Sequence, residues 1–147
     1  MALSIASTQW ADLRKHGEET FPYECCGVLV GRFDDNGAKV VDAVVRCENQ
    51  RTDSPHNRYV IDPRQLVRIQ REAREREQDI VGFYHSHPQH PARWSSTDLE
   101  EAHWTGCSYV ITSVMDGEAA QTNSFELITE EESKQFQDEE VTILQTI

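Results

Sequence analysis

The sequence of 147 residues predicts an α/β domain in which a mixed sheet is flanked by helices. Two observations lead to this class. Short apolar runs bounded by glycine, proline and turn residues recur along the chain, and segments with apolar residues at helical spacing lie between them. Because no internal repeat or linker-like stretch divides the chain, we expect a single domain spanning residues 1–147, with one core.

The N-terminal third predicts a helix followed by two strands. Ser7 is expected to cap a helix over residues 8–18. The stretch PYECCGVLVG at 22–31 is typical of a buried strand, and a DDNG turn connects it to a second strand at 39–47.

The middle of the chain predicts a loop, a short strand and a well-defined helix start. Residues 48–57 are polar and interrupted by proline, and RYVI at 58–61 predicts a short strand. Asp62 is expected to cap the next helix, with Pro63 in its first turn and Gln65 completing a capping box.

The second half predicts a central strand, because the run DIVGFYH is continuously apolar up to its histidine. The expected elements are a strand at 79–85, a helix from Ser95 or Ser96 to about 105, strands at 107–114 and 123–128, a short helix at 129–137 and a final strand or tail at 141–147.

The formal charge of −12 disfavours a nucleic-acid-binding module, which needs a basic face. No stretch reaches the roughly 18 apolar residues of a membrane helix, and the N-terminus lacks the pattern of a signal peptide, so we expect a cytoplasmic protein without membrane partners. The acidic stretch 126–140 favours a solvated face, with docking of a basic partner as the alternative.

The four cysteines form no C-x-x-C pair, which argues against a zinc ribbon or a thioredoxin-type motif. Cys25 and Cys26 are adjacent, so on a strand they would point to opposite faces. We expect Cys25, Cys26, Cys47 and Cys107 to be buried free thiols.

The stretch GFYHSHPQHPARWSSTD (82–98) contains the candidate chemistry. His85 and His87 stand at i and i+2, so on an extended segment both imidazoles project from the same face and can share one metal ion. Asp98 follows eleven residues after His87, beyond a loop stiffened by two prolines, and is expected in the first turn of a helix. Zinc takes such ligands and keeps an open position when it is catalytic.

Each fragment also has a purely structural interpretation. Ser95 and Asp98 have the spacing of a capping box, and an isolated H-x-H pair is more often incidental than metal-binding. Glu24 on its own is most simply a surface residue at the start of a strand.

Together these residues resemble the JAMM (MPN+) metalloprotease family. The segment from His85 to Asp98 has the family's spacing, H-S-H-P-x6-S-x-x-D. The segment PYECCGVLVG is similar to the P-x-E-x-C-G-x-L-x-G of bacterial and archaeal members, and Asn49 and RYVIDP (58–63) also match short members. The resemblance extends over residues 8–128 and implies an MPN/JAMM fold with a cytidine-deaminase-like architecture.

The resemblance implies a role for each matching residue. His85, His87 and Asp98 would bind one zinc ion, with the fourth position open to water. Glu24 would act as the proton carrier for that water, and Ser95 would stabilise the oxyanion of an amide under hydrolysis.

The resemblance also implies a substrate: the amide bond after the C-terminal Gly-Gly of a ubiquitin-like β-grasp or sulfur-carrier protein. The leaving group and the oligomeric state stay open, a homodimer included. The main alternative is a non-catalytic MPN-type scaffold that binds a protein partner. A zinc deaminase is disfavoured because the C-x-x-C of its signature is missing.

Several residues near the motif are weaker candidates. Trp94 stands where short homologues often have proline, and with His90 it is a possible substrate contact. His90 is otherwise expected to be simply exposed. Phe83 and Tyr84 are expected in the core, with a role in lining a tail channel as the alternative. His103 is a weak candidate for orienting a metal ligand.

Overall fold

The structure, a computed structural model, describes residues 2–51 and 58–145. The expected loop at 48–57 therefore lies mostly outside the described residues. In chain order the elements are β1 (Ala2–Ala6), α1 (Ser7–Thr20), β2 (Cys26–Phe33), β3 (Lys39–Cys47), α2 (Pro63–Glu75), β4 (Asp79–Pro88), α3 (Ser96–Glu101), β5 (Ser108–Met115), β6 (Glu118–Glu130) and β7 (Ser133–Leu144).

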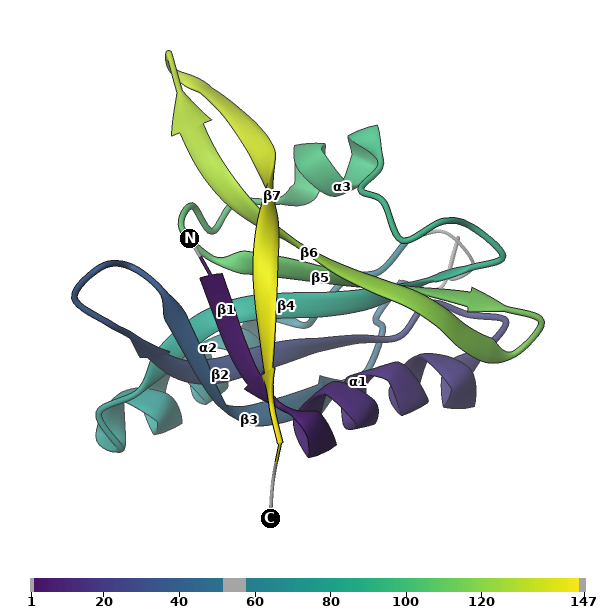
Figure 1. The fold of residues 1–147 in the computed structure, drawn as a ribbon, viewed down its shortest axis with the longest axis horizontal. Coiled ribbons are helices and arrows are strands. Elements are labelled where there is room, and N and C mark those ends of the chain that lie inside the picture. The colour runs from purple at the N-terminus through teal and green to yellow at the C-terminus, as the bar shows by residue number, and fades with distance from the viewer. Residues whose placement is uncertain (1, 52–57, 146–147) are drawn as a thin grey trace.

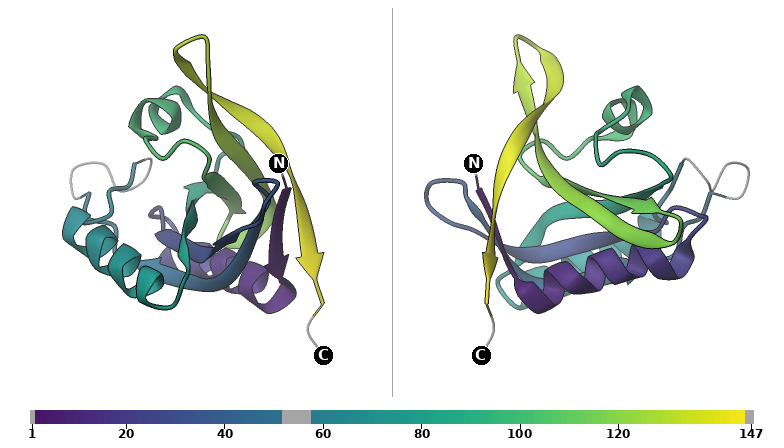
Figure 2. Two further views of the ribbon diagram at one scale, coloured as in Figure 1. Left: turned by 90° about the vertical axis from the view of Figure 1, so that its left-hand side faces the viewer. Right: turned by 45° about the vertical axis from the view of Figure 1, so that its right-hand side comes forward.

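The strands form one mixed sheet that curls into a closed barrel in the order β1-β3-β2-β4-β5-β6-β7. β1 closes it by pairing in parallel with both β3 and β7. β4 pairs antiparallel with β2 and parallel with β5, so it is a central strand as expected. α1 runs along the sheet in Figure 1, whereas α2 and α3 lie on one side of the barrel and β7 on the other in Figure 2. The predicted mixed α/β class is confirmed.

Two apolar clusters lie on opposite faces of β2, and the adjacent cysteines divide between them. Cys26 packs with Phe83, Tyr109 and the buried residues of α2. Cys25 packs with Tyr84 and with apolar residues of α1 and β1. The expected alternation of the two thiols is confirmed, and all four cysteines are free and buried.

The starts of α1 and α2 differ in part from expectation. α1 begins at Ser7, so Ala6 occupies the cap position, where its N–H donates to Gln9 Oε1 at 3.0 Å. The expected cap at Ser7 is therefore wrong by one residue. Asp62 does cap α2, because its carboxylate accepts from the N–H of Arg64 at 2.9 Å.

Three expected elements need correction. Residues 58–61 form no strand, because their backbone is held by Asn49 rather than by a sheet neighbour. α3 ends at Glu101, short of the expected residue 105. The helix expected at 129–137 is instead the turn of a long β6–β7 hairpin, where Glu131 and Glu132 adopt positive φ angles of 50° and 65°.

The acidic stretch 126–140 is not a uniformly solvated face. Glu126 and Glu139 are buried and contact Lys39, whose side chain is completely inaccessible. Counting charges within the stretch cannot reveal this pairing, because Lys39 lies 87 residues before Glu126 in the sequence. Among the described residues, no helix combines the length and apolarity needed to cross a bilayer.

Candidate metal centre and active site

The end of β4 carries the two candidate histidine ligands. Phe83, His85 and His87 alternate with residues of the opposite face, so their side chains project from the same face of the strand. Ser86 points the other way, towards α1, where its Cβ lies 3.2 Å from the position that a Cβ on Gly17 would take. The expected common face of His85 and His87 is therefore present.

The start of α3 brings Asp98 to these histidines. Ser95 Oγ accepts from the Asp98 N–H at 3.1 Å, and the Ser95 N–H donates to Asp98 Oδ2 at 2.8 Å, a reciprocal capping box. Asp98 Oδ1 lies 3.2 Å from His85 Nε2, and Asp98 Oδ2 lies 3.2 Å from His87 Nε2. The capping interpretation and the ligand interpretation of Asp98 are both compatible with this geometry.

The three side chains have the spacing of a metal-binding triad. The two Nε2 atoms of His85 and His87 lie 3.1 Å apart, so each edge of the triangle measures 3.1–3.2 Å. Zinc bonds of about 2.0–2.2 Å in tetrahedral geometry separate two ligand atoms by roughly 3.3–3.6 Å, slightly more than these edges. The three ligand atoms are therefore close enough together to hold one ion.

Burial and charge favour the protonation states of His85 and Asp98 that a metal requires. Burial, opposed by hydrogen bonding and attraction to Asp98, lowers the pKa of His85. Burial alone would raise the pKa of Asp98, but hydrogen bonds and attraction from His85, with further bonds from His87 and Ser95, hold that pKa well below its usual range. Neutral imidazole and ionised carboxylate are the forms that ligate metals.

The surroundings orient the two imidazoles differently. His87 Nδ1 lies 3.0 Å from the Pro91 carbonyl oxygen, a contact that fixes the tautomer with Nε2 free for a ligand. The ring of Tyr59 stacks on His85 with centroids 4.6 Å apart. His85 Nδ1 has no hydrogen-bond partner among the described residues, so His103 does not orient His85 through a hydrogen bond.

Glu24 lies immediately before β2, beside the histidines. Its neighbour Cys25 accepts from the Ser86 N–H at 3.3 Å, and the next residue, Cys26, pairs with His85 in the sheet. Glu24 is only 4% exposed, so the interpretation as a surface residue is wrong. Burial, reinforced by the charges of Asp98 and Glu101, raises the pKa of Glu24 to about 9.

Glu24 has the environment of a proton carrier. Its Oε1 atom is buried and has no hydrogen-bond partner among the residues that the structure describes. A cation in the triad would offset the repulsion from Asp98 and lower this pKa. A buried carboxylate with a raised pKa can hold and release a proton in general acid–base catalysis.

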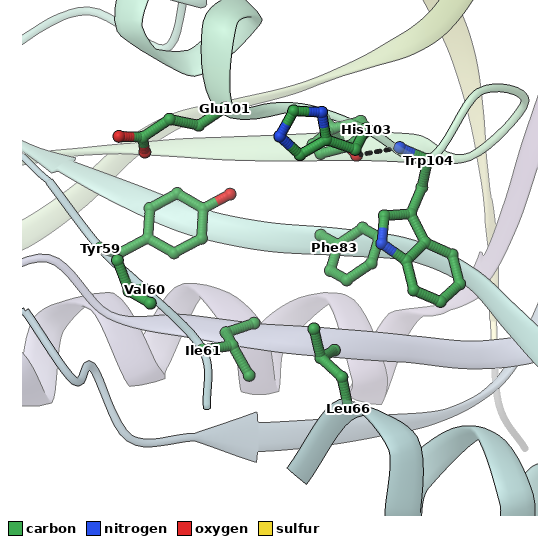
Figure 3. A pocket seen from close by; sticks show the side chains of 9 residues that line it. Tyr59, Val60, Ile61, Leu66, Phe83, Glu101, His103 and Trp104 are labelled. Atoms are coloured by element: carbon green, nitrogen blue, oxygen red, sulfur yellow. Dashed lines mark hydrogen bonds between the residues drawn. The ribbon is translucent and has the colours of Figure 1, made fainter. Parts of the chain in front are cut away.

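Two hollows lie near the triad: one contains Tyr59, which stacks on His85, and the other contains His87. The first, the apolar hollow, has a volume of about 290 Å³ and is shown in Figure 3. It lies between the segment leading into α2 and the segment leading into β5. The backbone N–H of Trp104 donates to the Tyr109 hydroxyl at 3.1 Å and holds Trp104 in place there. Its lining residues are Tyr59, Val60, Ile61, Leu66, Phe83, Glu101, His103, Trp104 and Tyr109.

The second, the basic hollow, has a volume of about 340 Å³ and contains Glu24 and His87 together with two arginines. Its lining residues are Glu24, Arg58, His87, His90, Pro91, Arg93, Ser95 and Thr97. The structure thus brings the candidate proton carrier, a candidate ligand and the Ser95 hydroxyl to one hollow.

The weaker candidate residues differ in their burial and in whether they line a hollow. His90 is exposed, as expected, and lines the basic hollow. Trp94 is 39% exposed and packs against Phe136, but it lines neither hollow. Phe83 and Tyr84 are both buried, and Phe83 also faces the apolar hollow.

Sequence reasoning missed Tyr59, Arg58 and Arg93. No local signal identifies Tyr59, because its contact with His85 spans a loop. The two arginines are ordinary polar loop residues until the fold places them beside His87.

Comparison with known proteins agrees with the geometry. The family model for prokaryotic homologues of the JAB domain matches residues 7–128. The desampylase of Haloferax volcanii is 36% identical over an alignment of 115 residues, and the match covers 76% of this chain and 80% of that protein. A probable TtuB-protein conjugate cleaving protease of Thermus thermophilus is 30% identical over 93 residues, which are 63% of this chain and 58% of that protein.

Solved structures share the fold. A solution structure from Desulfitobacterium hafniense has a TM-score of 0.78 and 25% identity, covering 99% of this chain and 94% of the other. One from Salinibacter ruber has a TM-score of 0.72 and 35% identity, with coverage of 95% and 90%. The chain belongs to the family of prokaryotic homologues of the JAB domain and is a hydrolase of the JAMM type.

Proposed function

We propose that the chain is a zinc-dependent peptidase or isopeptidase that hydrolyses the amide bond after the C-terminal Gly-Gly of a ubiquitin-like β-grasp protein. The triangle of His85, His87 and Asp98, with edges of 3.1–3.2 Å beside a buried carboxylate, is the observation that carries the proposal. The relatives named for conjugate cleavage and for desampylation support the substrate class. A sulfur-carrier protein with a Gly-Gly tail belongs to that class.

Each residue of the site contributes one part of the hydrolysis. His85, His87 and Asp98 would hold the zinc ion, which when bound supplies Lewis acidity to the substrate carbonyl and activates water. Glu24 takes a proton from the attacking water and delivers it to the leaving nitrogen. The Ser95 hydroxyl accepts the Asp98 N–H, so its own proton is free to be donated to the developing oxyanion.

The apolar hollow is suited to the carbonyl side of the scissile bond. It adjoins His85 through the stacked ring of Tyr59 and offers Phe83, Leu66 and Trp104 to the apolar residues that precede an extended Gly-Gly tail. Glycines at the end of the tail have no side chains, so they pass the buried histidines without steric conflict.

We infer that one domain spanning residues 1–147 performs this reaction. The barrel closes only through β7, which lies beyond the part matched by the family model, because β7 pairs with β1 along five residues. A shorter fragment would leave the edges of β1 and β6 unpaired.

The test is a cleavage assay followed by mass spectrometry. The substrate is a sulfur-carrier-type β-grasp protein extended beyond its terminal Gly-Gly, incubated with wild type, with wild type plus chelator, and with Glu24→Gln. We expect a cut after Gly-Gly that is lost in both controls and restored when zinc is added back to the chelated enzyme. Absence of a cut by protein with stoichiometric zinc would contradict the proposal and favour the scaffold interpretation.

A further inference from the structure

We propose that the enzyme selects a leaving group with a free carboxylate close to the scissile nitrogen, and that Arg58 and Arg93 bind this carboxylate. The proposal rests on the proposed function, because it specifies the leaving group of the same reaction. It predicts a preference for an amino acid joined through its α-nitrogen over a lysine joined through Nε.

The order of residues along β4 assigns the two sides of the bond. Phe83, His85 and His87 follow one another on a single face, with about 7 Å between successive members. Phe83 lines the apolar hollow and His87 lines the basic hollow, so the metal triad lies between them. If the tail occupies the apolar hollow, the leaving group enters the basic hollow.

The charge of the basic hollow is opposite to that of the chain. Acidic residues outnumber lysine and arginine by 26 to 14 overall. In the basic hollow, two arginines and one carboxylate, that of Glu24, line the walls. Because the basic hollow has an excess of positive charge in a negatively charged protein, it is suited to bind an anionic ligand.

Among the described residues, no ion pair holds either guanidinium group of the basic hollow. Arg46 pairs with Asp12 and Glu19, and Arg32 pairs with Asp42. Arg58 and Arg93, by contrast, have no carboxylate within ion-pair distance among the described residues, although they lie beside a metal triad. Their planar donor groups are therefore available to bind a carboxylate through two parallel hydrogen bonds.

The backbone that carries Arg58 is fixed relative to the proton carrier. Asn49 Nδ2 donates to the Arg58 carbonyl at 3.0 Å and to the Glu24 carbonyl at 3.3 Å. Asn49 Oδ1 accepts from the Val60 N–H at 3.1 Å. One side chain thus ties the Arg58 segment to the Glu24 segment.

The opposite wall of the hollow is fixed as well. Ser113 Oγ donates to the His90 carbonyl at 2.6 Å, and Asn123 Nδ2 donates to the Ala92 carbonyl at 3.0 Å. Ala92 is 1% exposed and anchors the loop in the core just before Arg93. Both walls are therefore organised before a ligand binds, which lowers the entropy cost of binding.

The position of the carboxylate discriminates between leaving groups. In an amino acid joined through its α-nitrogen, the carboxyl carbon is two bonds from the scissile nitrogen. In a protein lysine joined through Nε, the nearest α-carbonyl is six bonds away and is part of an uncharged amide. Hydrolysis adds water across the C–N bond, so the tail leaves as a carboxylate and the amino acid leaves with its amine protonated.

The experiment compares three substrates built on one β-grasp protein ending in Gly-Gly. The first is extended by alanine, the second by alaninamide, and in the third Gly-Gly is joined to the lysine Nε of a blocked peptide. We expect wild type to cleave the alanine substrate with a kcat/KM at least about tenfold higher than the alaninamide substrate, since a hydrogen bond between charged groups contributes this much.

Arginine variants locate the source of the preference. Arg58→Gln and Arg93→Gln should each reduce the alanine-to-alaninamide ratio severalfold, mainly through KM, and Arg93→Lys should restore part of it. Arg71→Gln, on the exposed surface of α2, is the matched control and should keep the wild-type ratio. A general structural defect would lower cleavage of both substrates and leave their ratio unchanged.

The outcomes separate the two proposals. Equal cleavage of the alanine and alaninamide substrates, or a ratio that survives both Arg→Gln changes, overturns the carboxylate proposal and leaves the proposed function intact. Preference for the lysine-linked substrate also overturns it and identifies an isopeptidase for folded conjugates. Failure to cleave any of the three by zinc-loaded protein overturns both proposals.

Discussion

The hydroxyl of Ser86 accepts a hydrogen bond from the backbone N–H of Cys25 at 2.8 Å, and the Ser86 N–H donates to the Cys25 carbonyl at 3.3 Å. Ser86 lies between the two candidate histidine ligands but points to the opposite face of β4. It therefore connects the strand that carries the histidines to the residue that follows Glu24. This pair fixes the backbone next to Glu24 relative to the strand that carries His85 and His87.

Ser86→Ala should separate this positioning from metal binding. The buried Cys25 N–H would lose its partner, at a cost of about 1–3 kcal/mol in the free energy of unfolding. We expect kcat to fall by about tenfold while the zinc content stays the same, measured by cleavage kinetics and elemental analysis. Cys25→Ala is the control, because it retains the backbone N–H. Wild-type turnover by Ser86→Ala would show that Glu24 is held by other contacts.

Zinc stoichiometry should distinguish ligands from the proton carrier. Asp98→Asn and His87→Gln each remove one corner of the triad, so we expect both to lose most of their zinc during gel filtration. Glu24→Gln should retain close to one zinc per chain and lose activity. His90→Gln, an exposed neighbour in the same loop, should retain zinc as the matched control. Full zinc occupancy in Asp98→Asn would remove Asp98 from the ligand set.

The stability of the metal-free protein should depend on Glu24 and on pH. Because burial raises the pKa of Glu24 to about 9, the folded state keeps a proton that the unfolded state releases near pH 4.5. The stability that Glu24 contributes is therefore fully present below pH 4.5 and is lost as the pH rises towards 9. Glu24→Gln should remove this loss.

Thermal unfolding in chelator is the measurement for Glu24. At pH 8 the Tm of Glu24→Gln should exceed that of wild type by several degrees, and at pH 5 the two should nearly coincide. Glu77→Gln, at an exposed position after α2, is the control and should follow the wild-type profile. Parallel profiles for wild type and Glu24→Gln would mean that Glu24 is not buried as a neutral acid in the metal-free protein.

Local patterns predicted the elements whose signals are contained within a few residues. The run at 79–85 indicated a central strand because it is apolar on both faces, and Asp62 with Pro63 indicated the start of α2 because both groups act within one turn. Local patterns gave the wrong prediction for the β6–β7 hairpin. Its stretch TEEESKQFQ is rich in helix formers, yet Phe136 is drawn into contact with Tyr109 and Phe125, and this tertiary packing overrides the propensity.

The candidate site was predictable to the extent that it is a sequence motif. The i, i+2 spacing of His85 and His87 indicated a common face, and the capping box indicated where Asp98 would turn back. The burial of Glu24 and the stacking of Tyr59 on His85 were not predictable from local sequence. Both depend on segments more than 20 residues away along the chain, which only the closed sheet and the Asn49 contacts bring to β4.

Ser95 should show two separable effects. Ser95→Ala removes both the cap of α3 and the proposed oxyanion donor, so we expect a loss of about 1 kcal/mol in the free energy of unfolding and a fall in kcat of about 100-fold or more. Ser95→Thr retains a hydroxyl and should recover much of both. The measurements are chemical denaturation and cleavage kinetics. A loss of stability without a loss of kcat would limit Ser95 to capping.

A buried ion cluster outside the metal triad connects β3, β6 and β7. Lys39 Nζ on β3 donates to Glu126 Oε1 on β6 at 2.6 Å and lies 2.8 Å from Glu139 Oε2 on β7. The hydroxyl groups of Ser108 and Ser124 donate to the other oxygen of Glu139 at 2.6 and 2.7 Å. One lysine therefore compensates two carboxylates from the strands that complete the sheet.

Removing that lysine should destabilise the fold without altering the chemistry. Lys39→Met removes the ion-pair partner that Glu126 and Glu139 share, so we expect the free energy of unfolding to fall by about 3–5 kcal/mol. The triple change Lys39→Met, Glu126→Gln and Glu139→Gln should recover a large part, because it also removes the two buried negative charges. Lys15→Met, at an exposed position on α1, is the matched control. Denaturant unfolding gives the energies, and kcat per folded molecule should stay at the wild-type value, since none of these groups borders the metal triad. A loss below about 1 kcal/mol for Lys39→Met would show that the two carboxylates are solvated or protonated at little cost.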